Sequence, residues 1–169
     1  MKIIEAMRKI KINLERVATY QKQIGQYCAD YEVQDATYPD QAGQVRSWLT
    51  ASHDLLEEVE RLKRQISATN LATQVTIVIE GQRIAKSITE WISRRDTLAK
   101  LELATWEALG DKGLTTQPVK DPATGEVRLI KVRRYFDPKE RDAKVMAFRA
   151  EPHTIDGALE VVNATTDLI

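Results

Sequence analysis

Few side chains in this sequence are of the types that do chemistry, apart from carboxylates. The two histidines are His53, which is followed by Asp54, Glu57 and Glu58, and His153. His53 and Glu57 lie one helical turn apart and could hold a metal ion, but a cluster of this kind is typical of a solvated helix face. The sequence has no glycine-rich phosphate loop and no HExxH or GxSxG motif. We therefore expect no catalytic residue, no metal site and no bound cofactor.

Cys28 is the only cysteine, so neither an internal disulfide nor a multi-cysteine metal site can form. It falls on an apolar helical stripe, where cysteine packs as a small hydrophobic residue, and we favour a structural role over a reactive one. A lone cysteine also fits a reducing compartment. We expect the protein to be cytoplasmic, or incorporated into a particle assembled in the bacterial cytoplasm.

The densest basic run lies between residues 128 and 136, next to two aromatic residues. Its candidate partner-binding residues are Arg128, Lys131, Arg133, Arg134, Tyr135 and Phe136. Such a run could bind phosphates and stack on a base. In a strand, however, alternation sends these charges to both faces, and charge on an exposed hairpin also prevents aggregation at its edges. We favour solvation or a protein contact over nucleic acid.

Tryptophan is enriched in the energetically dominant parts of protein interfaces, so each of the three tryptophans is a candidate either for partner binding or for core packing. Trp48 and Trp91 fall on apolar stripes and are assigned to the core. Trp106 lies off the main stripe of its predicted helix, which makes it the seventh candidate partner-binding residue.

Composition predicts long helices rather than a thick globular core. Of the 169 residues, 30% are charged and only 6% are aromatic, which suits helices that share narrow seams. Basic and acidic residues both number 25, so no overall charge attracts the chain to nucleic acid or a membrane. We treat residues 1–169 as one domain, and expect no signal peptide and no membrane-spanning segment.

Apolar residues spaced alternately by three and four positions predict two long helices. The first seam comprises Ile3, Met7, Ile10, Leu14, Val17, Gln21, Ile24, Cys28 and Tyr31. The second comprises Val45, Trp48, Ser52, Leu55, Val59, Leu62, Ile66 and Thr69. Turn-forming residues 35–40 separate the seams, so the helices should fold back as an antiparallel coiled-coil hairpin.

The second half of the chain predicts a mixture of elements. Alternation over residues 74–80 favours a short strand, and residues 82–109 favour a third helix. Residues 114–136 are typical of a β-hairpin arm, which would need support because an isolated two-stranded hairpin is marginal in water. A last helix begins at Asp137-Pro138, and we expect a kink or break near Glu151 because Pro152 follows.

Several short motifs together resemble a bacterial family labelled septicolysin-like, whose members are small helical proteins without an assigned catalytic activity. The motifs are Asn70-x-x-Thr73, Arg94-Arg95-Asp96-x-Leu98, Val132-Arg133-Arg134-Tyr135-Phe136 and the segment from Ile155 to Leu168. The resemblance covers nearly the whole chain in segment order. Unlike family members, this chain has Pro152 in its last helix and Ala164 after the terminal asparagine.

These observations predict a mainly α protein, built from antiparallel coiled-coil hairpins in a long-helix bundle with a small β-hairpin arm. We expect a non-enzymatic structural or assembly protein that forms homo-oligomers and contacts other protein subunits, for example in a phage or phage-like particle. The alternatives are a nucleic-acid-binding accessory protein that uses residues 128–136 and, less favoured, a membrane-active toxin. No segment is long and apolar enough to enter a bilayer, so we expect no membrane partner.

Overall fold

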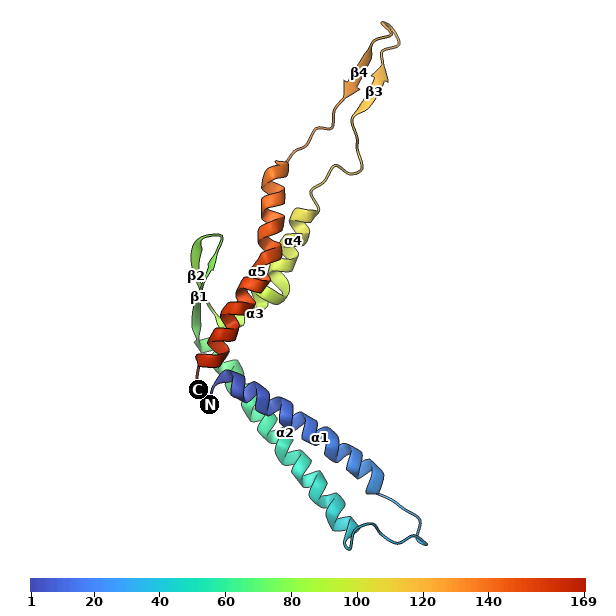
Figure 1. Ribbon diagram of the computed structural model, residues 1–169, viewed down its shortest axis with the longest axis vertical. Helices are drawn as coiled ribbons and strands as arrows, with labels where there is room; N and C mark the ends of the chain where they lie inside the picture. Colours follow the sequence, from blue (N-terminus) through green and yellow to red (C-terminus); the bar gives the residue numbers. More distant parts are fainter. The chain divides into compact units, whose positions relative to one another are not determined.

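The computed structural model describes residues 1–169, and the chain is mainly helical, as predicted. It has two small β-sheets of two strands each, of which only the arm was predicted. Its elements, labelled in Figure 1, are α1 (Ile3–Tyr27), α2 (Gln41–Ala72), β1 (Gln74–Ile79), β2 (Gln82–Ser87), α3 (Ile88–Ser93), the π-helix η1 (Arg94–Leu98), α4 (Ala99–Glu107), β3 (Gln117–Lys120), β4 (Val127–Ile130) and α5 (Pro138–Thr165). No helix combines the length and apolarity needed to cross a membrane.

The chain divides into two compact units that alternate along the sequence. Unit 1 comprises Met1–Val75, Ser87–Thr89 and Leu159–Ile169, and unit 2 comprises Thr76–Lys86 and Glu90–Ala158. Four elements, β1, β2, α3 and α5, each contribute residues to both units. The single domain expected from sequence stays a prediction.

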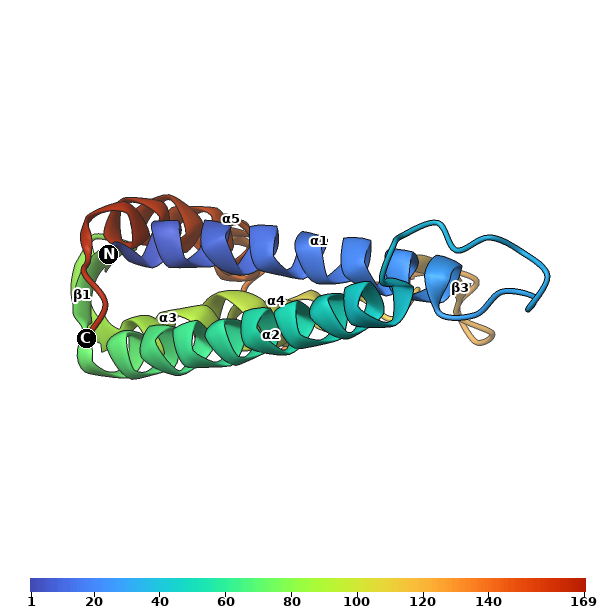
Figure 2. The ribbon, with the colours of Figure 1, turned by 90° about the horizontal axis from the view of Figure 1, so that it is seen from below.

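Helices α1 and α2 form the predicted antiparallel hairpin of unit 1 and lie side by side (Figures 1 and 2). Helix α2 begins where the Asp40 carboxylate accepts a hydrogen bond from the Gly43 N–H at 2.8 Å, a standard N-cap. Its buried residues, Trp48, Val59, Leu62 and Thr69, all belong to the predicted second seam.

The first seam is shifted relative to the prediction. The buried residues of α1 are Ile3, Ala6, Asn13 and Val17, whereas Met7 and Leu14 are 51% and 42% exposed. Ala6 and Asn13, which are seven residues apart, take the places predicted for Met7 and Leu14, so the seven-residue repeat is kept while the buried face of α1 is rotated. Helix α1 ends at Tyr27, which leaves Cys28 exposed at the C-cap and not in a seam. The coiled-coil geometry stays a prediction.

The short strand predicted over residues 74–80 is confirmed as β1, but the prediction that residues 82–87 are helical is wrong. These residues form β2, which pairs with β1. Glu80 and Gly81 have φ of 48° and 80°, and two consecutive positive φ angles make a tight two-residue hairpin turn of the I′ type. This turn folds the chain back before the helix starts at Ile88.

The third helix contains a π-helical insertion that the sequence did not predict. The N–H of Ala99 donates to the carbonyl of Arg94, five residues earlier, which defines η1. The wider turn takes up one extra residue and rotates the following side chains. Ala99 is buried, while the apolar side chains of Leu98 and Leu101 are 47% and 60% exposed.

Helix α5 continues through Pro152, so the break expected near Glu151 does not occur. Proline has no backbone N–H, so the helix loses only the hydrogen bond that residue 152 would donate to the carbonyl of Phe148. Buried side chains on both sides of the proline hold the helix in place, namely Phe148, Glu151, Ile155 and Leu159.

Unit 1 is closed by residues from far apart in the sequence. Lys2 and Asp167 form an antiparallel β-bridge, and the Lys2 ammonium lies 2.6 Å from the Asp167 carboxylate. This contact lowers the pKa of Asp167 below its ordinary value. The N–H of Ile169 donates to the Thr69 hydroxyl at 3.1 Å.

Candidate functional site

The predicted β-arm is present as the antiparallel pair β3–β4, whose strands cover a shorter part of the chain than residues 114–136. Gln117 pairs with Ile130 and Lys120 with Val127. A tight loop closes the ribbon: the Gly125 N–H donates to the Asp121 carbonyl at 2.8 Å, and Gly125 has a φ of 73° that favours glycine. Residues 131–137 lie outside any strand, so the prediction that the β-hairpin arm extends to residue 136 is wrong.

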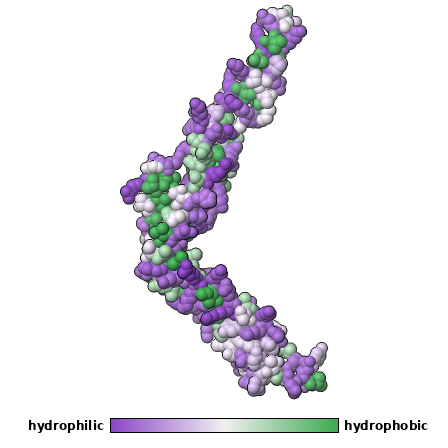
Figure 3. Space-filling view, viewed as in Figure 1, coloured by the Kyte–Doolittle hydropathy of each residue, from purple (hydrophilic) through white to green (hydrophobic).

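Every residue of the two arm strands is exposed to solvent. The exposed apolar side chains are Val119, Val127, Leu129 and Ile130, with exposed fractions from 44% to 64%. Pro118, Leu129 and Val127 share one face of the ribbon, and Val119 and Ile130 share the other, because directly opposed residues point to the same side. Green, apolar surface is therefore visible along the arm in Figure 3.

The base of the arm is fastened to the helices that carry it. Arg134 makes two hydrogen bonds of 2.6 Å to Asp111, and the guanidinium lowers the pKa of that carboxyl below its ordinary value. The Arg141 side chain donates to the carbonyl of Leu109 at 2.9 Å and lies 6.0 Å from the Phe136 ring. Both contacts join the segment before the arm to the segment after it.

Further arginine contacts continue along the two helical stretches below the arm. Arg149 lies 2.7 Å from Glu107, and Arg95 lies 2.7 Å from Asp156. Between them, Arg94 binds Glu151 through two hydrogen bonds of 2.6 and 2.9 Å and also binds Glu102. Glu151 is only 5% exposed, and the pair of carboxylates raises the pKa of Arg94 above its ordinary value.

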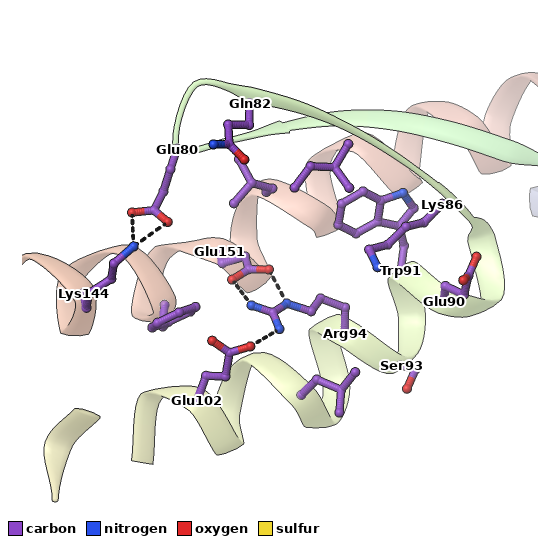
Figure 4. Close-up of a pocket in the computed structure, with 14 residues that line it drawn as sticks. Glu80, Gln82, Lys86, Glu90, Trp91, Ser93, Arg94, Glu102, Lys144 and Glu151 are labelled. Carbon is purple, nitrogen blue, oxygen red and sulfur yellow. Dashed lines mark hydrogen bonds and ion pairs between the residues drawn. The ribbon is translucent and has the colours of Figure 1, made fainter. Parts of the chain in front are cut away.

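Figure 4 shows Arg94, Glu102 and Glu151 in a cavity of about 840 Å³ in unit 2. Residues from β1, β2, α3, η1, α4 and α5 line it, and the Lys144 ammonium closes one side through Glu80 at 3.1 Å. Arg94 and Lys144 both lie over the Phe148 ring, at 5.6 and 6.0 Å. In the cavity centre Arg94 binds Glu151 and Glu102, and these ion pairs fasten α5 to η1 and α4.

The structure separates the predicted partner-binding residues into two groups. Arg128, Lys131, Arg133 and Tyr135 are exposed, and Tyr135 reaches 89%. Arg134 and Phe136 instead serve the base of the arm through Asp111 and Arg141. Trp106 is half-buried, and its spacing of seven residues from the buried Ala99 puts both on one side of α4.

Sequence reasoning did not assign a structural part to Arg94, Glu102 or Glu151. From sequence, Arg94-Arg95-Asp96 stands only as a motif of the family resemblance, and Glu151 only as the residue before Pro152. A charged residue at the apolar spacing of α5, between Phe148 and Ile155, is the signal that could have revealed Glu151. No group of three His, Cys, Asp or Glu side chains is placed to hold a metal ion.

Comparison with known proteins supports the fold alone. No family model matches the sequence, and no curated protein matches it significantly. The crystal structure of a functionally unknown conserved protein from Corynebacterium diphtheriae is similar, with a TM-score of 0.58 and 19% identity over 100% of this chain and 99% of that one. An experimentally determined protein therefore shares this fold.

Proposed function

We propose that the chain is a non-enzymatic assembly protein whose β3–β4 arm joins it to other copies of itself. The observation that carries the proposal is the ribbon's uncovered apolar surface on a firmly anchored base. A two-stranded ribbon gains little stability alone, and its unpaired edges can accept another strand. Burial of a Val, Leu or Ile side chain contributes about 1.5–3 kcal/mol, so a partner covering the ribbon would stabilise it substantially.

The anchored base favours assembly over a purely solvated loop. Arg134–Asp111 and Arg141–Leu109 fix where the arm leaves the helices, so less freedom is lost when the arm binds. A loop without a partner would gain nothing from such fastening or from four exposed apolar side chains.

The test is the absolute mass in solution, measured by light scattering over a range of concentrations. We expect a defined multiple of the 19.2 kDa chain. The variant Val127→Thr, Leu129→Thr and Ile130→Thr keeps strand-forming residues but removes apolar surface. It should require at least about 10-fold higher concentration to assemble, since 1.4 kcal/mol corresponds to a factor of ten.

The matched control is Met146→Ser, which removes a 72% exposed apolar side chain from α5 and should leave assembly unchanged. A wild-type protein that stays at 19.2 kDa throughout would contradict self-assembly. If it instead binds duplex DNA with steep salt dependence, lost on Lys131→Ala with Arg133→Ala, then the partner of the arm is nucleic acid.

A further inference from the structure

The loop between α1 and α2, residues 28–40, is tied down at its base. The Gln41 side chain accepts hydrogen bonds from the backbone N–H groups of Thr37 and Tyr38, at 2.8 and 3.4 Å, and donates to the carbonyl of Tyr27 at 3.0 Å. Tyr27, Tyr38 and Trp48 pack against one another with ring centroids 5.3–5.8 Å apart. The loop thus keeps a defined shape.

The tip of this loop presents apolar side chains to solvent beside a cavity. Tyr31 is 77% exposed and Val33 is 94% exposed, the highest value among the large hydrophobic residues. The adjoining cavity of about 690 Å³ is lined by residues that include Tyr27, Tyr31, Gln34 and Asp35. A polar connection that only joined two helices would not need this surface.

The loop and the arm carry opposite charge. Between Lys22 and Arg46 every charged residue is acidic, namely Asp30, Glu32, Asp35 and Asp40. Residues 114–136 hold five basic residues against two acidic ones. Glu32 and Asp35 in the loop, and Lys131 and Arg133 in the arm, are exposed and form no ion pair within the chain.

From these features we infer that the arm of one copy docks on the α1–α2 loop of a second copy. Exposed Val127 and Leu129, which share one face of the ribbon, would cover Tyr31 and Val33, and Lys131 and Arg133 would face Glu32 and Asp35. The inference rests on the proposed function and names the receptor of the arm. Because two different surfaces meet, the contact is heterologous, which closes into a ring or continues as a filament.

Charge exchange tests the inference. Glu32→Lys with Asp35→Lys makes a basic loop, and Lys131→Glu with Arg133→Glu makes an acidic arm. Each variant alone should need at least about 10-fold higher concentration to assemble, because like charges then face each other. A 1:1 mixture of the two variants, or one chain carrying all four changes, should assemble again because every loop meets an arm of opposite charge.

The matched control is Glu57→Lys with Glu60→Lys, which makes the same change in net charge on two α2 side chains that are 71% and 68% exposed. It should leave assembly unchanged. If wild-type protein assembles and the threonine arm variant does not, but the basic loop has no effect, then the loop is not the receptor while the arm keeps its function. Failure of the mixture to assemble also overturns the inference, and a monomeric wild type overturns both proposals.

Discussion

Glu58 is the residue whose charge state links α1 to α2 most directly. Its carboxylate lies 2.7 Å from the Lys9 ammonium of α1 and 2.9 Å from Arg61 of its own helix. Hydrogen bonds to Arg61 and then to Lys9 lower its pKa from 4.5 to about 2. The folded chain therefore holds the ionised form more strongly than the unfolded chain does.

This shift predicts acid sensitivity of the hairpin. A carboxyl with a depressed folded pKa contributes stability that is complete above its unfolded pKa of 4.5 and is lost as the pH falls toward about 2. Urea unfolding followed by helical circular dichroism at pH 7 and pH 2.5 should show a smaller decrease for Glu58→Gln than for wild type. Glu60→Gln, 68% exposed, is the control; equal decreases in Glu58→Gln and wild type would refute the assignment.

At the scale of elements, the contact of Arg94 with Glu151 fixes α5 against the π-helix. Glu151→Ala would leave a largely buried guanidinium with only Glu102, and breaking a buried pair typically costs about 3–5 kcal/mol. We expect the lower end, about 3 kcal/mol, because Arg94 keeps a partner and some solvent contact. The free energy of unfolding from urea titration is the measurement.

Glu107→Ala is the natural comparison, since it removes another arginine contact between α4 and α5. Glu107 and Arg149 are 46% and 65% exposed, and exposed pairs contribute about 0–1 kcal/mol. A similar loss in both variants would show that the buried position of Glu151 is unimportant.

The elements also show where periodicity is sufficient for prediction and where it fails. The α2 seam, the α1–α2 hairpin, β1 and the arm follow from local spacing and turn residues, which act within a few positions. Strand β2 was missed because the turn depends on the backbone angles of Glu80 and Gly81, which no Asn-Gly or Asp-Gly pair announces. The π-helix was missed because one extra residue in a helical turn does not change the composition of the segment. The turn nevertheless changes which side chains after Arg94 are buried, and Ala99 is buried while Leu98 is exposed.

The sequence predicted where the candidate interface lies, but not which of its side chains are free to bind a partner. Sequence spacing located the arm and its exposed Lys131 and Arg133, but could not show that Arg134 is bound to Asp111. Sequence spacing did not predict an interface on the α1–α2 loop. The exposure of Tyr31 and Val33 depends on where α1 ends and on the hydrogen bonds of Gln41 to the loop.

At the scale of the whole molecule, stability is distributed unevenly. The arm strands have no buried side chain, whereas the helices of both units do. Segments with little buried surface open locally at small free-energy cost. Trypsin should therefore cut the free chain first at Lys131 or Arg133, well before Lys63 or Arg64 in the middle of α2, as mass spectrometry of the fragments would show. Assembly should slow the arm cleavage, and initial cuts in α2 would contradict this distribution.

The division of unit 1 along the sequence has a consequence for synthesis on the ribosome. The α1–α2 hairpin consists of early residues and can form soon after it leaves the exit tunnel. Its closing contacts, Lys2 with Asp167 and Thr69 with Ile169, require residues that are translated only after all of unit 2. The α1–α2 hairpin therefore lacks its closing contacts throughout translation of unit 2. We expect chaperones to bind the hairpin during that interval.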